Sequence, residues 1–150
     1  METTSRAVWF SWCLIGIGRA DGLNNGIVLC GENSKLGVMY RKQYSSTILN
    51  NVQLPSVNYG DTIDVAIVFH YSSLTYEVYV NGEYVGSSTI LPENWNLDGR
   101  NDLRIGSDFY EIASPYNDNF KRYNVLYYSR ALTADEIQYN FDIDCERFGL

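Results

Sequence analysis

Short apolar runs separated by Gly, Asn, Asp and Ser recur along the chain, and in two of these runs apolar residues occupy every second position. Between Thr62 and Tyr71 the residues on one side are Ile63, Val65, Ile67 and Phe69, and between Leu74 and Val80 they are Leu74, Tyr76, Val78 and Val80. A period of two with many β-branched and aromatic residues is typical of β-strands. Further short apolar runs bounded by turn residues predict strands over Trp9–Ile17, Gly26–Cys30, Leu36–Arg41, Thr47–Leu54, Asp102–Ser107 and Tyr123–Tyr128.

Two local motifs complete the secondary structure. Asn81-Gly82 separates two apolar runs, and this pair favours a tight β-hairpin because both central residues of a type I′ turn need positive φ. Thr133 and Glu136 have the spacing of a capping box, which predicts a short helix after Thr133. About ten strands and one short C-terminal helix imply an all-β fold, an antiparallel sandwich of two sheets packed face to face. The length of 150 residues suggests a single domain, residues 1–150.

Composition narrows the class of protein. The chain is 45% hydrophobic and 19% charged, which is too apolar for a disordered chain. Its net charge of −7 argues against nucleic acid as a partner, and no apolar run is long enough to span a membrane. The 13 tyrosines exceed what a dry core can hold with their hydroxyls satisfied, so we expect several on the surface.

The amino terminus superficially resembles a secretory signal, because Arg6 precedes an apolar stretch from Ala7 to Gly18. Glu2 offsets Arg6, however, and no A-x-A cleavage box follows. We therefore expect the segment to be an uncleaved strand. Accordingly, we expect the protein at the cell surface or in a virion, as part of a larger assembly, or otherwise in the cytoplasm.

The cysteines and the single histidine offer little catalytic chemistry. Cys13, Cys30 and Cys145 have no zinc-type spacing, and three cysteines cannot all pair with one another. Reduced thiols packed as small hydrophobic groups are the favoured interpretation, with one disulfide as the alternative. His70 follows a strand pattern without a nucleophile motif, which favours a structural or surface role.

An ordered set of motifs resembles the laminin-G-like modules of the concanavalin A-like lectin/glucanase superfamily. The motifs are Tyr79-Val-Asn-Gly-Glu-Tyr-Val85, Leu103-Arg-Ile-Gly-Ser107 and the stretch from Tyr123 to Ile137. The resemblance covers about residues 60–137 and implies a jelly-roll β-sandwich. Family members usually have a further strand or two before the strand that contains Trp9. The resemblance thus suggests a shortened edge, which another protein subunit could complete.

Enzymes of this fold often carry an E-x-D-x-x-E strand, and the pattern is missing here. The acidic residues Asp142, Asp144 and Glu146 fall on or after the predicted helix, where a solvated face is the favoured interpretation. We therefore expect no enzymatic activity. Rim loops of such sandwiches often bind Ca²⁺, and Asp98, Asn101 and Asp102 supply suitable oxygen ligands beside Gly99, although Asn and Asp also simply form turns.

Glycan binding is the use that the resemblance suggests first. It requires an aromatic plate for the sugar ring and polar groups for its hydroxyls. The candidates in loops are Trp95 with Asn94 and Asn96, Tyr110 with Asp108, and Tyr116 with Asn117, while Tyr40 and Tyr44 are candidates on the concave sheet. The alternative is a structural or decoration component of a phage virion or surface assembly, in which tyrosine-rich faces form protein–protein contacts.

Overall fold

The computed structural model describes residues 12–19, 26–32, 35–41, 48–56, 61–89, 101–105 and 123–150, and all structural statements refer to these residues. They form eight strands and one helix. The elements are β1 (Trp12–Arg19), β2 (Gly26–Glu32), β3 (Lys35–Arg41), β4 (Ile48–Gln53), β5 (Val65–His70), β6 (Thr75–Val80), β7 (Glu83–Thr89), β8 (Asn101–Ile105) and α1 (Ala134–Phe148).

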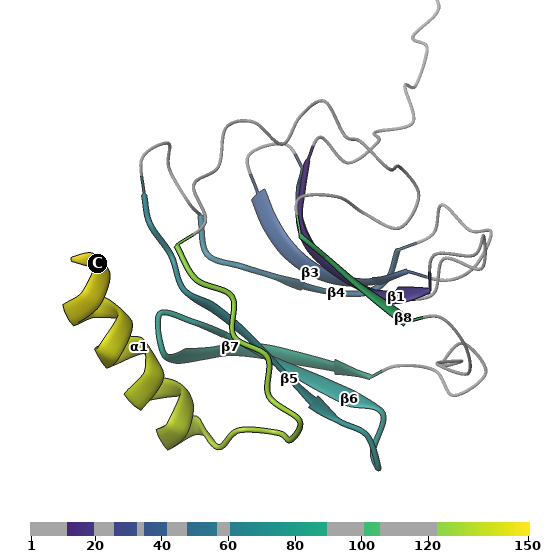
Figure 1. Ribbon diagram of the computed structural model, residues 1–150. Helices are drawn as coiled ribbons and strands as arrows, with labels where there is room; N and C mark the ends of the chain where they lie inside the picture. Colours follow the sequence, from purple (N-terminus) through teal and green to yellow (C-terminus); the bar gives the residue numbers. More distant parts are fainter. Residues whose placement is uncertain are drawn as a thin grey trace, which may run out of the picture.

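The strands form two antiparallel sheets (Figure 1). One has five strands in the order β4-β3-β2-β1-β8, and the other has three in the order β5-β6-β7. Within each sheet the strands that follow one another in the sequence pair, and β8 is added to the free side of β1. The predictions of mostly antiparallel sheet and of one C-terminal helix are therefore confirmed.

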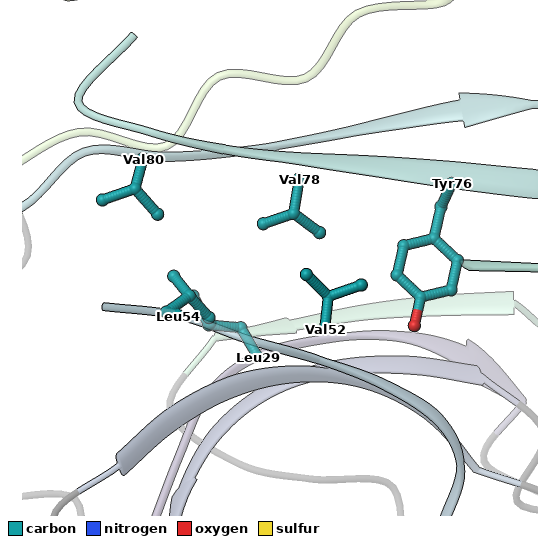
Figure 2. Packing of buried hydrophobic residues seen from close by; sticks show 6 residues of the cluster. All are labelled: Leu29, Val52, Leu54, Tyr76, Val78 and Val80. Carbon is teal, nitrogen blue, oxygen red and sulfur yellow. The ribbon is translucent and has the colours of Figure 1, made fainter. Parts of the chain in front are cut away.

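Buried side chains from both sheets meet in one cluster (Figure 2). Leu29 of β2 and Val52 of β4, together with Leu54, face Tyr76, Val78 and Val80 of β6. Tyr76 and Val78 are 0% exposed. Alternate residues of β5 pack around the same cluster, which is the burial expected from the period-two pattern.

The hairpin between β6 and β7 turns at Asn81 and Gly82, as predicted. Their φ angles are 52° and 80°, so both central residues adopt the left-handed conformation. Asn81 also holds the start of β5, because its Oδ1 accepts a hydrogen bond from the Asp64 backbone N–H at 2.9 Å. In return the Asn81 backbone N–H donates to the Asp64 carbonyl at 3.0 Å.

Gly82→Ala is expected to lower the free energy of unfolding by about 1–2 kcal/mol, since an alanine at positive φ strains the backbone. A Cβ at this position would also clash with the side chain of Gln138 in α1, which can move aside. Urea unfolding measures the loss. An unchanged midpoint would contradict the turn geometry. Gly149→Ala separates the backbone strain from the clash, because Gly149 also has positive φ but an added Cβ there would meet no neighbouring atom.

The predicted capping box is present at the start of α1. The Glu136 backbone N–H donates to Thr133 Oγ1 at 3.3 Å, and the Thr133 N–H donates to Glu136 Oε2 at 2.9 Å. Arg130 also donates to both oxygens of Glu136, and this contact lowers the pKa of Glu136 to about 2. In the described part of the chain, α1 is not long and apolar enough to cross a membrane.

The strand predicted over Tyr123–Tyr128 is wrong. These residues belong to no strand, and every side chain from Tyr123 to Arg130 is exposed. A period-two pattern produces a strand only where a neighbouring backbone completes the hydrogen-bond ladder, and no such partner is present among the described residues. The segment contacts α1 instead, where Asn140 Nδ2 donates to Tyr128 Oη at 3.1 Å.

Candidate functional site

Helix α1 covers part of the face of β5 and β6 that points away from the five-stranded sheet, here called the outer face. Val68 of β5, Tyr79 of β6 and Ile137 of α1 form a second buried cluster there. Ala66 and Leu132 pack around it. These strand residues alternate with those of the main core, so β5 and β6 are packed on both faces.

Beyond the helix, the outer face carries a group of four interacting polar and aromatic side chains, here called the Tyr84 cluster: His70, Glu77, Tyr79 and Tyr84. Tyr79 and Tyr84 lie opposite each other on β6 and β7, with ring centroids 5.6 Å apart and an interplanar angle of 72°. Tyr79 is 7% exposed, whereas Tyr84 is 56% exposed. The buried ring therefore supports an exposed one by an edge-to-face contact.

Glu77 lies beside these rings and contacts two partners in the cluster. The Tyr79 hydroxyl donates to Glu77 Oε2 at 2.9 Å, and His70 Nε2 lies 3.3 Å from Glu77 Oε1. The His70 and Glu77 side chains are 35% and 33% exposed, so a molecule in solvent can reach part of each, although His70 Nε2 itself is buried. When His70 is protonated, this contact becomes an ion pair.

Burial raises the pKa of Tyr79 to about 12, and its hydrogen bond to Glu77 and the charge of Glu77 act in the same direction. The hydroxyl thus keeps its proton and goes on donating to Glu77 at any physiological pH. This donor fixes the orientation of a negatively charged carboxylate close to an exposed aromatic ring. Chemically, the arrangement provides a flat apolar surface and a hydrogen-bond acceptor side by side.

A second feature is a pair of carboxylates where α1 packs against the start of β5. Asp144 is only 8% exposed, so the prediction of a solvated acidic face is wrong for this residue. Asp144 follows Ile137 by seven residues, about two helical turns, and both therefore belong to the buried side of α1. Asp142 and Glu146 are exposed as predicted.

Burial raises the pKa of Asp64, and the neighbouring charge of Asp144 raises it further. A folded state that favours the protonated acid is most stable below the unfolded-state pKa and loses that contribution as pH rises through the folded-state pKa. We expect Asp64→Asn to remove this loss, making the variant more stable than the parent at neutral pH. Urea unfolding from pH 3 to pH 8 gives the free energy of unfolding of parent and variant as a function of pH. The two curves should approach each other as the pH falls to the ordinary pKa range of carboxyl groups. Parallel curves would contradict the raised pKa.

Most of the ligand-binding residues predicted from the sequence lie outside the described residues: Asn94, Trp95, Asn96, Asp108, Tyr110, Tyr116, Asn117 and Tyr44. Tyr40 lies in β3, opposite Ile27 of β2 and Leu49 of β4. Of the predicted calcium ligands, Asn101 and Asp102 begin β8, opposite Arg19 and Gly18, and Asp98 lies outside the described residues. Within the described ranges no group of three His, Cys, Asp or Glu residues is arranged to hold a metal ion.

The Tyr84 cluster was not predicted as a binding site, although its sequence signal is visible in retrospect. Tyr79 and Tyr84 flank the Asn81-Gly82 turn. The register of a tight hairpin places such flanking residues opposite each other on one face. Glu77 shares the same face because it precedes Tyr79 by two residues on β6. The position of His70 beside Glu77 depends on the pairing of β5 with β6, which the local sequence does not specify.

Comparison with known proteins identifies the family. A model of the concanavalin A-like lectin/glucanases superfamily matches residues 5–138, which confirms the resemblance drawn from the sequence motifs. Among solved structures, the chain is similar to an S-layer domain-containing protein (residues 221–444) from Clostridium thermocellum. The two are 22% identical with a TM-score of 0.39, over 94% of this chain and 68% of that one. A search of curated proteins found no significant match.

Proposed function

The chain belongs to the concanavalin A-like lectin/glucanase superfamily, and from this premise we propose that it is a non-catalytic carbohydrate-binding and adhesion module that recognises surface glycans. The observation that supports the proposal best is the exposed Tyr84 ring, held by Tyr79 beside the oriented carboxylate of Glu77. An aromatic plate stacks against the C–H face of a pyranose, and a fixed carboxylate accepts hydrogen bonds from its hydroxyls.

The energetic requirement is modest. Covering one aromatic face removes about 50 Å² of surface from water, which contributes roughly 1 kcal/mol. A millimolar dissociation constant corresponds to about 4 kcal/mol. One stacked ring and a few charge-assisted hydrogen bonds, such as those that the Glu77 carboxylate can accept, are of the size needed for a weak lectin site.

The proposed module is non-catalytic, and the arrangement of the described carboxylates is consistent with this part of the proposal. Hydrolysis of a glycosidic bond needs two carboxyl groups on either side of it, about 5–9 Å apart. Glu77 is bound to Tyr79 and His70, and neither can replace the second acid. Asp64 and Asp144 are near enough for the charge of Asp144 to raise the pKa of Asp64, but Asp144 is only 8% exposed and offers little surface to a sugar.

The proposal also covers the arrangement of the sheets, the loop around Trp95 and a calcium ion. The two sheets would be the layers of a jelly-roll sandwich, the fold of this superfamily. The predicted loop residues around Trp95 would extend the sugar site or form a second one. A calcium ion held by Asp98, Asn101 and Asp102 would order that loop, so EDTA would weaken binding through the Trp95 loop and leave binding at Tyr84 unchanged.

A glycan array followed by titration of the best ligand tests the proposal. We expect Tyr84→Ala to weaken binding about fivefold to tenfold, the equivalent of roughly 1 kcal/mol. Tyr71→Ala is the matched control, since Tyr71 is 76% exposed and lies outside the cluster. Loss of binding with Trp95→Ala alone would move the site to the predicted loop, and an array with no bound glycan would refute the lectin function.

A second candidate is a structural or decoration component of a virion or surface assembly. The observation that favours it is the exposed stretch Tyr123–Tyr128, which includes Val125, Leu126 and Tyr127 at 42%, 56% and 75% exposure and carries no charge. Exposed tyrosines and apolar residues of this kind are typical of protein interfaces. Light scattering distinguishes the candidates, because a stable oligomer that binds no sugar supports assembly and a monomer that binds sugar supports the lectin.

A further inference from the structure

The pairing of β1 with β2 brings two of the three cysteines to the same position in the five-stranded sheet. Cys13 and Cys30 are direct partners across the two antiparallel strands. A β-bulge follows immediately, where Ile15 rather than residue 14 pairs with Leu29. The cysteines are 17 positions apart in the sequence, so only the strand register brings them together.

The backbone geometry of such a pair suits a covalent link. Residues directly opposite each other in antiparallel strands have Cα atoms about 4.5 or 5.5 Å apart, depending on the hydrogen-bonding pattern. Disulfides join residues whose Cα atoms are about 4.4–6.8 Å apart. Both types of opposite pair therefore fall within the range that a disulfide requires, without movement of the strands.

The register also places the pair on the face of the sheet that points away from the main core cluster. Leu29 belongs to the core cluster, so its neighbour Cys30 falls on the opposite face. The same row continues through Gly37 of β3 to Gln53 of β4, which is exposed. Gly37 is buried but adds no side chain next to Cys30, and the pairing of β1 with β8 begins only at Ile15, beyond Cys13.

We propose that Cys13 and Cys30 form a reversible cross-strand disulfide that fastens β1 to β2. The juxtaposition favours the disulfide alternative over the reduced thiols that composition alone favours. The oxidant is a low-molecular-weight disulfide. One cysteine thiolate attacks it and releases one small thiol, and the second cysteine thiolate then attacks the mixed disulfide and releases the other. The protein loses two protons and two electrons, and the small disulfide gains them as two thiols.

Cys145 is an internal comparison for this chemistry. It carries a free thiol on α1, far along the chain from the strand pair. Burial raises its pKa, and the nearby charges of Asp142, Asp64 and Asp144 raise it further, which lowers the fraction of reactive thiolate. Cys145 should therefore remain a thiol under conditions that oxidise the pair.

The experiment incubates the folded full chain with oxidised glutathione, blocks free thiols at low pH and measures the intact mass and tryptic peptides. We expect a mass lower by two hydrogen atoms before blocking and one blocked thiol, at Cys145. Trypsin should give residues 7–19 cross-linked to residues 20–35, because Arg19 separates the two cysteines, while residues 131–147 appear uncross-linked. Reduced glutathione should reverse the link.

Variants make the outcome specific. Cys145→Ser should leave the cross-link unchanged, whereas Cys13→Ser and Cys30→Ser should each abolish it and leave the remaining cysteine as a glutathione adduct. The oxidised parent should unfold at a higher temperature than the reduced parent, and this difference should vanish in Cys30→Ser. Three results on the parent chain overturn the proposal: both cysteines remain blockable, both carry separate glutathione adducts, or either one pairs with Cys145.

Discussion

Replacing Tyr76 by alanine is expected to lower the free energy of unfolding by about 3–5 kcal/mol, as for other large aromatic residues removed from a core. Tyr76 is 0% exposed and joins the cluster in which β6 meets Leu29 and Val52 of the other sheet. Its ring centroid lies 6.2 Å from that of Phe69. The variant leaves a cavity beside Phe69 where the Tyr76 ring was, and urea unfolding followed by circular dichroism measures the loss of stability.

The matched control is Tyr127→Ala, which removes the same side chain from a position that is 75% exposed. We expect that variant to change the free energy of unfolding by no more than about 0.5 kcal/mol. Equal effects of the two substitutions would contradict the core assignment. Tyr76→Phe separates the contribution of the ring from that of the hydroxyl. The hydroxyl hydrogen-bonds Ser88, and burial raises the pKa of Tyr76 to about 12. Because the phenylalanine keeps the buried ring, its free energy of unfolding should fall much less than that of the alanine variant.

The second large effect is expected from Ile137→Ala, which should lower the free energy of unfolding by about 2–5 kcal/mol. Ile137 is 2% exposed and packs on Val68 and Tyr79, so it fastens α1 to the outer face. Weaker docking of the helix should also let water reach Tyr79, moving its pKa down from about 12 toward the ordinary tyrosine value. Urea unfolding and absorbance titration of tyrosine measure the two consequences.

Tyr139→Ala serves as the control for that variant, since Tyr139 lies on the same helix at 66% exposure. A large loss of stability in Tyr139→Ala, with little change in Ile137→Ala, would show that α1 packs through a different side. The burial of Asp144, which lies on the same side of the helix as Ile137, would then have no explanation.

Features that depend on a few neighbouring residues could be predicted from the sequence. The Asn81-Gly82 turn has one strongly favoured geometry, because both residues tolerate positive φ, and the structure has it. The capping box at Thr133 is likewise local, since its four atoms come from one helical turn. The apolar runs and the Asn81-Gly82 turn also located β2 to β8 to within a few residues of their ends.

Features that depend on distant partners could not be predicted. Tyr123–Tyr128 has a strand pattern, but a strand needs a neighbouring ladder, and the described chain supplies none there. Asp144 looks like a surface acid until the length of α1 and the side it packs through are known. The Tyr84 cluster requires the β5–β6 register to bring His70 to Glu77, and the opposition of Cys13 and Cys30 requires the register of β1 on β2.

The central claim is that the Tyr84 cluster is a glycan platform, and heteronuclear NMR of the chain titrated with its best array ligand tests it most directly. The account predicts that the signals that shift and saturate together belong to Tyr84, Glu77 and His70, with intermolecular contacts between the Tyr84 ring and sugar C–H protons. Saturable shifts elsewhere, with these three residues unchanged, would contradict it.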